Sequence, residues 1–131
     1  MADFVPTRPV KDELSSTGAQ IRIYRMAGDA GAGANGISEW RDVQKVQDMT
    51  FMLYPAGPDQ QGDISAAVVE IQASLENDVD NPETETDYVV IATLDNTTRI
   101  ASFAGNLQNV RIEMTTPGAV AAQVGMQTFG I

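Results

Sequence analysis

Apolar and polar residues alternate with a period of two along most of the chain from about residue 19 onward. This period is typical of β-strands that turn one face toward a core and the other toward solvent. The clearest example runs from residue 67 to residue 75. Its expected inward-facing residues are Val69, Ile71, Ala73 and Leu75, and its expected outward-facing residues are Val68, Glu70, Gln72 and Ser74. The same pattern predicts strands at residues 21–26, 49–54, 110–115 and 120–126, and a short strand at residues 100–103.

Three local features refine this pattern. Residues 88–94 are apolar on both faces, which predicts a central strand that is covered on each side. The sequence Thr116-Pro117-Gly118-Ala119 suits a type II turn, so we expect it to join the last two strands as a hairpin. Between residues 37 and 49 apolar residues recur at every third position, which fits either a short strand near residues 40–46 or a helix.

These segments amount to seven or eight short strands with turns at regular spacing. The sequence therefore predicts an all-β fold, an antiparallel β-sandwich of jelly-roll-like type. The length of 131 residues allows one domain, which we place at residues 19–131. Residues 1–18 are expected to form an extended arm, because Pro6 and Pro9 disfavour regular strand pairing and many of its other residues are polar.

Charge and composition exclude several classes of function. The net charge of −10 argues against a nucleic-acid partner, because it repels a phosphate backbone. Histidine and cysteine are both absent, which rules out cysteine nucleophiles, disulfides, His–Cys zinc sites and Ser–His relays. No apolar stretch approaches the roughly 18 residues of a membrane span, and we expect no secretion signal in the first residues. The prediction is a structural or binding protein that is not an enzyme, takes no cofactor and does not enter a membrane.

Two segments could in principle carry chemistry. Residues 31–36 match the GxGxxG spacing of a nucleotide-binding loop, but no amphipathic helix follows them, so we expect a surface loop. Residues 76–87 are rich in carboxylates, the ligand type that calcium prefers. Their spacing departs from the EF-hand loop at Pro82 and Glu83, which leaves calcium binding and a solvated acidic loop as alternatives. A hydrolase built on these carboxylates is the weakest hypothesis, because the chain has few aromatic residues to line a sugar cleft.

Three segments carry a resemblance to a known family: AVVEIQASLEN at residues 67–77, YVVIATL at 88–94 and NVRIEMT at 109–115. They resemble the strand pattern of small tailed-bacteriophage virion proteins with a jelly-roll or sandwich domain, and Trp40 fits the opening half of that pattern. The resemblance implies a non-catalytic capsid decoration or cement protein that stabilises the phage head lattice. It implies the major capsid protein as partner, a homo-oligomer (a trimer) as assembly, and a place on the capsid surface of the virion after synthesis in the host cytoplasm.

In such a role, the arm and the last six residues are expected to contact neighbouring subunits or the capsid, because spaced apolar residues in extended chain can add to a neighbour's sheet. The candidate interface residues are Phe4, Val5, Val10, Leu14, Phe129 and Ile131. The alternative is a receptor- or carbohydrate-binding module of a phage head or tail fibre. Its candidate aromatic platform is Trp40, Tyr24 and Tyr54, and it predicts that Trp40 or Tyr54 is exposed.

Overall fold

The computed structural model describes most of the chain between residues 9 and 130. The described residues are 9–16, 18–25, 36–55, 61–62, 64, 67–74, 88–104, 107–116 and 122–130. They form nine strands: β1 (Pro9–Leu14), β2 (Ala19–Arg25), β3 (Arg41–Asp42), β4 (Val46–Pro55), β5 (Val68–Ser74), β6 (Val89–Leu94), β7 (Ile100–Ala104), β8 (Asn109–Thr116) and β9 (Ala122–Gly130). None of the described residues belongs to a helix that could cross a bilayer.

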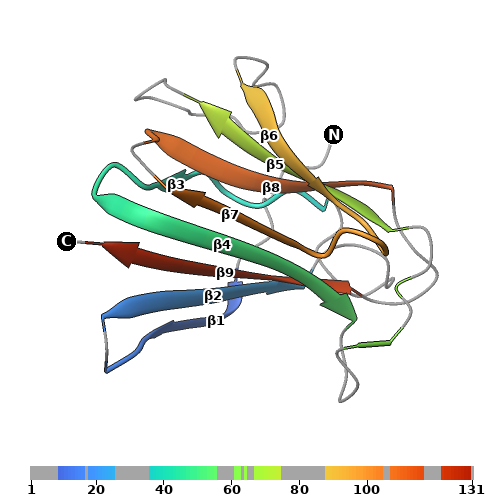
Figure 1. Cartoon of the computed structure of the whole chain (residues 1–131), viewed down its shortest axis with the longest axis horizontal. Helices are drawn as coiled ribbons and strands as arrows, with labels where there is room; N and C mark the ends of the chain where they lie inside the picture. The colour runs from blue at the N-terminus through green and yellow to red at the C-terminus, as the bar shows by residue number, and fades with distance from the viewer. Residues whose placement is uncertain are drawn as a thin grey trace, which may run out of the picture.

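The strands form two antiparallel sheets. The first has the order β1-β2-β9-β4-β7 and the second the order β3-β8-β5-β6. In Figure 1 the strands of the first sheet follow one another from the bottom of the view upward, with β8, β5 and β6 of the second sheet above them. The predicted all-β antiparallel sandwich is therefore confirmed, with nine named strands in the described part of the chain.

The alternation that predicted the strands also sorts their side chains between core and surface. On β4, Met49, Phe51 and Leu53 are buried, while Met52 between them is 40% exposed. The Phe51 ring meets Phe103 of β7 edge-on, with ring centroids 6.1 Å apart. The core draws on both sheets, and its largest members include Tyr24, Met49, Phe51, Leu53, Ile64, Ile71, Leu94, Ile112 and Met126. The expected inward residues of β5 and β8 that the structure describes are buried as well.

The prediction of a central strand at residues 88–94 is wrong. β6 is the edge strand of the second sheet and pairs only with β5 among the described strands. Its apolar residues are partly open to solvent, with Val89 at 67% exposure and Val90 at 40%. β6 thus combines the apolar pattern of a covered central strand with an edge position.

The predicted hairpin between the last two strands is wrong too. β8 belongs to the second sheet and β9 to the first, where β9 pairs with β2 and β4. The chain therefore crosses from one layer to the other between residues 116 and 122, and the proposed turn residues 117–119 lie outside the described residues. An alternating strand buries the same face in either layer, so the sequence pattern did not reveal the crossing.

The helical alternative for residues 37–49 is also wrong. Ile37 forms an isolated bridge with Glu113, and residues 41–42 form the short strand β3. A turn follows, in which the Asp42 carboxylate accepts the Gln44 amide at 3.0 Å and the Val46 amide donates to the Val43 carbonyl at 3.0 Å. The spacing of three thus reflects a bridge, a short strand and a turn in succession.

Residues 9–14 of the predicted arm form β1, which pairs with β2. The expectation that the prolines disfavour regular pairing is wrong for this part, because Pro9 is the first residue of an edge strand, where its missing amide hydrogen costs little. The register shifts between Pro9 and Lys11. Residues 1–8 lie outside the described residues.

Candidate functional site

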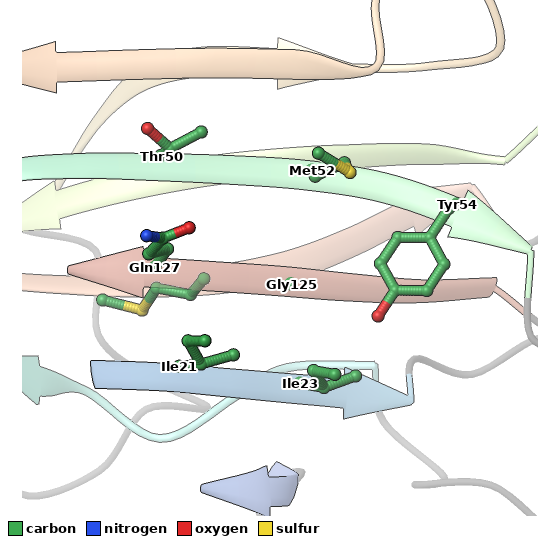
Figure 2. A pocket seen from close by; sticks show the side chains of 8 residues that line it. Ile21, Ile23, Thr50, Met52, Tyr54, Gly125 and Gln127 are labelled. Atoms are coloured by element: carbon green, nitrogen blue, oxygen red, sulfur yellow. The ribbon is translucent and has the colours of Figure 1, made fainter. Parts of the chain in front are cut away.

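The outer face of the first sheet carries a shallow groove of about 170 Å³. Figure 2 shows its lining, which comes from the three neighbouring strands β2, β9 and β4. The lining residues are Ile21, Ile23, Thr50, Met52, Tyr54, Gly125, Met126 and Gln127. These strands turn alternate residues toward the core, so the groove is lined mainly by the residues of the opposite face, together with Met126 of the core.

Two rows of paired residues cross this face at right angles to the strands, and we call them the groove rows. The first row is Ile21, Gln127, Thr50 and Ser102, and the second is Ile23, Gly125, Met52 and Ile100. Neither row contains a charged residue on these four strands, whereas on β1 the ladder continues the rows to Glu13 and Lys11, which form an ion pair of 3.6 Å. In the second row, Met52 on β4 is 40% exposed and Ile100 on the edge strand β7 is 55% exposed. In the first, the Thr50 and Ser102 hydroxyls are hydrogen-bonded to each other at 3.0 Å.

Gly125 forms the floor of the groove because it brings no side chain between Ile23 and Met52. A Cβ atom placed on Gly125 would lie 3.5 Å from Cε1 and 3.8 Å from the hydroxyl oxygen of Tyr54. Figure 2 shows the Tyr54 ring reaching from β4 across β9, with its hydroxyl directed toward β2. Burial raises the pKa of the Tyr54 phenol above its ordinary value, and a hydrogen bond with Gln123 acts in the opposite direction.

The polar groups of this lining are the neutral side chains of Thr50, Tyr54 and Gln127. Together with the apolar residues, they suit contact with an apolar or uncharged surface of a partner, which gains from the removal of apolar area from water. The groove is too small for a drug-sized ligand, whose pockets usually measure about 300–1,000 Å³. A protruding side chain of another protein is a better match in size.

The outer face of the second sheet is built differently, around the side chain of Arg111 on β8. Its guanidinium carbon lies 4.6 Å from the ring centroid of Trp40 and 4.9 Å from that of Tyr88. We call these three residues the Arg111 stack. Cation–π contacts of this kind stabilise by up to about 2 kcal/mol when the cation is desolvated, and Arg111 is only 3% exposed. The stack therefore fastens the chain before β3 and the chain before β6 onto β8.

A hydrogen-bond network continues from the stack along the sheet. The Arg111 Nε donates to the Gln72 amide oxygen at 2.6 Å. The Gln72 amide nitrogen donates to Glu113 at 2.8 Å and to Glu70 at 3.0 Å. Glu70 and Glu113 face each other across the β5–β8 ladder, and the shared amide relieves the repulsion of two like charges in that position. Gln72 was expected to point outward; it does so, yet it is fully buried within this network.

In the described part of the chain, no three Asp, Glu, His or Cys residues are placed to hold a metal ion. The acidic segment 76–87 and the glycine-rich residues 31–35 lie outside the described residues. The calcium and hydrolase hypotheses for the acidic segment therefore stay predictions.

Three of the six predicted interface residues lie in the described part of the chain, and all three are exposed. Val10 and Leu14 on β1 are 61% and 70% exposed, and Phe129 on β9 is 43% exposed. Leu14 pairs with Gln20 and Phe129 with Ala19, so both lie at one end of the first sheet. The other three, Phe4, Val5 and Ile131, lie outside the described residues.

The three aromatic candidates for a carbohydrate platform do not come together. Tyr24 is fully buried in the core, and Tyr54 is only 7% exposed in the wall of the groove. Trp40 lies on the other sheet, with the Arg111 guanidinium over its ring. The expected exposure is thus wrong for Tyr54, and a ring covered by arginine is a poor platform for stacking a sugar.

The geometry defines the class of the protein as a two-sheet antiparallel sandwich with a groove of uncharged residues on the outer face of one sheet. A comparison with solved structures finds the SPBc2 prophage-derived protein YomS as a similar chain, with a TM-score of 0.50 and 14% sequence identity. The match covers 88% of this chain and 98% of YomS. At this identity the likeness concerns the fold. A scan of protein-family models gives no match to this sequence, and neither does a search of curated proteins.

Proposed function

We propose that this chain is a non-catalytic structural component of a tailed-phage particle that acts by docking onto another protein. The observation that carries the proposal is the pair of groove rows. A chain with a net charge of −10 holds two adjacent uncharged rows across β2, β9, β4 and β7, and the second of these rows is apolar throughout. Such a face is typical of a protein contact surface, since exposed apolar area otherwise favours aggregation.

Two lines of support connect this surface to phage. The strand segments resemble small tailed-phage virion proteins, and the structural neighbour YomS is itself prophage-derived. The similarity extends over nearly the whole of both chains, so it involves the entire sandwich rather than a shared hairpin.

The particular role we propose is that of a capsid decoration or cement protein, with the major capsid protein as its partner. The groove rows would meet the head lattice, because they offer apolar contact without desolvating a charge. The acidic remainder of the molecule would face solvent, where mutual repulsion keeps many crowded copies from associating. The protein would then lie on the capsid surface after its synthesis in the host cytoplasm.

The test is to locate the protein in phage particles produced by the genome that encodes it. Particles purified by density gradient are analysed by mass spectrometry and by immunogold electron microscopy. The proposal predicts many copies per particle and gold labels over the head. Absence from purified particles contradicts the structural role, and labels confined to the tail contradict the decoration role.

A pair of variants then tests the docking face. Met52→Lys places a charge in the second groove row, whereas Thr97→Lys places the same charge on the exposed turn between β6 and β7. We expect Met52→Lys to weaken binding to heads that lack the protein by about tenfold or more, and Thr97→Lys to bind as the parent chain does. Equal binding by both variants contradicts the assignment of this face.

A further inference from the structure

The two lateral sides of the sandwich differ sharply in charge. One side is formed by the edge strands β1 and β3, whose charged residues are Lys11, Asp12, Glu13, Arg41 and Asp42. Asp12 pairs there with Arg41 at 3.6 Å and with Arg22 at 3.5 Å. The opposite side is formed by the edge strands β6 and β7, which contact each other and contain no charged residue. Natural edge strands usually carry charge or proline to prevent pairing with another chain, and β6 and β7 have neither.

Apolar side chains are accessible along this uncharged side. Val89 is 67% exposed, Val90 40% and Ile100 55%. Ile91 and Phe103 are partly buried and pack against the core from β6 and β7. The two charged residues of the β6–β7 connection are hydrogen-bonded to neighbouring groups. Asp95 accepts hydrogen bonds from backbone amides of the turn, and Arg99 donates to the Asn96 side chain and to the Gly62 carbonyl before β5.

The sequence of β6 adds an independent observation. VVIATL is apolar on both faces, which is the pattern of a strand with neighbours on each side and cover on each face. Among the strands that the structure describes, β6 has a neighbour on one side only. Another strand along its free edge would resolve this mismatch between sequence and position, and would satisfy the open backbone groups of the edge.

We propose that a second copy of this chain supplies that strand, with β6 pairing antiparallel to β6 of the other copy about a two-fold axis. An axis normal to the sheets brings β7 beside β7 of the second copy at the same time, so both layers continue across the contact. In such an isologous contact each strand meets its own sequence. Like charges would then face one another directly or diagonally, which destabilises a strand pair. An uncharged edge in both layers is therefore what self-pairing needs, whereas a foreign strand requires only complementary charge.

A bulge limits the strength of this contact. The register between β5 and β6 shifts after Ile71, which leaves Ile91 without a partner opposite it and divides β6 into two short regular segments. The interface is therefore short, at the low end of specific interfaces, and a reversible dimer is expected rather than a permanent one. This pairing differs from the trimer that the sequence resemblance implies, since a two-fold contact closes at two copies.

Sedimentation equilibrium of the purified full chain over a range of concentrations tests the proposal. We expect a monomer–dimer equilibrium, which Val89→Lys weakens by about tenfold or more because a charge then faces its own copy. The control Leu14→Lys changes the net charge equally on the β1 edge, at a residue with similar exposure of 70%, and is expected to dimerise as the parent does. A monomer at about 1 mM, a trimer, or a dimer that Leu14→Lys disrupts and Val89→Lys does not would overturn the pairing.

A second measurement remains informative if Val89→Lys fails to fold. Because the chain has no cysteine, one introduced cysteine is its only thiol. A spin label at Thr93→Cys on β6 is expected to show dipolar coupling to the second copy, and the coupling should disappear on dilution with unlabelled protein. The same label at Leu14→Cys is expected to show none, and the reverse pattern contradicts the proposal. Both tests use the isolated chain, so their result is independent of where the protein lies in a particle.

Discussion

The Arg41 Nε donates a hydrogen bond of 3.1 Å to the hydroxyl of Tyr24, which joins β3 of one sheet to β2 of the other. Tyr24 is fully buried, and its hydroxyl lies where the core meets the charged side of the sandwich. Arg41 also contacts Glu39 at 2.8 Å and Asp12 at 3.6 Å. One guanidinium thus holds together β1, β2 and β3, on the side where the two layers are connected by polar contacts.

Tyr24→Phe is expected to destabilise the protein by about 1 kcal/mol, because it removes this hydrogen bond and keeps the ring in the core. The substitution should also change how the stability of the protein depends on pH in the alkaline range. Burial raises the pKa of the Tyr24 phenol above its ordinary value of 10.0, although the hydrogen bond from Arg41 lowers it. The unfolded chain therefore loses this proton first, and stability falls as the pH rises above about 10.

Urea unfolding of the parent and Tyr24→Phe between about pH 8 and about pH 11 measures both effects. The variant should be less stable near pH 8, and its stability should fall less steeply above pH 10. Tyr54, whose pKa burial also raises, contributes a remaining slope to both proteins. Parallel curves with no offset contradict the role of the Tyr24 hydroxyl.

Asp95→Ala is expected to weaken the turn between β6 and β7. The Asp95 carboxylate accepts the backbone amides of Thr98 at 2.7 Å and Thr97 at 2.9 Å, and these bonds lower its pKa. A lowered pKa means that the stabilisation is present above the unfolded value of about 4 and is lost as the pH falls below it. The matched variant Asp95→Asn keeps an acceptor oxygen and removes the titration.

The comparison is made by thermal unfolding at neutral pH and near pH 3. Asp95→Ala should be the least stable protein at neutral pH. Both variants should lose less stability on acidification than the parent does. If Asp95→Asn loses as much stability on acidification as the parent does, the titration of Asp95 does not cause the acid-induced loss of stability.

Arg111→Met is expected to destabilise the protein by about 2 kcal/mol, since it ends the cation–π contacts and leaves the buried Gln72 oxygen without its donor. Trp40 is the only tryptophan of the chain, so its fluorescence reports directly on the stack. The emission should shift in Arg111→Met, and Arg111→Lys should restore it only in part, because an ammonium lacks the planar stacking surface. The control Lys45→Met removes an exposed cation and should change stability by less than about 0.5 kcal/mol. An unchanged Trp40 spectrum in Arg111→Met contradicts the stack.

Two glycine substitutions are expected to act in opposite directions. Gly125→Ala places a Cβ in ordinary contact with Tyr54 and reduces the freedom of the unfolded chain, so it should stabilise by about 0.5 kcal/mol. Gly18→Ala meets a φ of +91°, which L-residues rarely adopt, and should destabilise by about 1 kcal/mol. Chemical denaturation of both variants decides the matter. A loss of stability in Gly125→Ala would mean that the floor of the groove has no room for a methyl group.

The sequence predicted the sandwich because alternation records burial, and most buried positions of β4, β5, β8 and β9 follow from it. Alternation does not record which strand lies beside which. The crossing between β8 and β9 and the edge position of β6 depend on pairings between residues far apart in the chain. Those pairings are decided by how both layers close over one core.

The candidate surfaces were harder to predict for a related reason. The groove rows combine Ile21 and Ile23 with Met52 and Gly125, which neighbour one another only through the ladders of β9. A glycine within a strand pattern was the one local signal, because such a residue often marks a close approach. The Arg111 stack depends on the register of β5 and β8 and on two segments outside these strands. The spacing of Trp40, Tyr88 and Arg111 in the sequence does not reveal it.

The most direct measurement of the central claim uses phage heads from a genome in which this gene is deleted. Purified chain is added back, and head binding and the temperature at which heads release their DNA are measured together. Saturable binding with a higher release temperature is the predicted result, and Met52→Lys should lower both effects. Heads that bind none of the added chain, or bind it with no change in heat resistance, would contradict a decoration protein that stabilises the lattice.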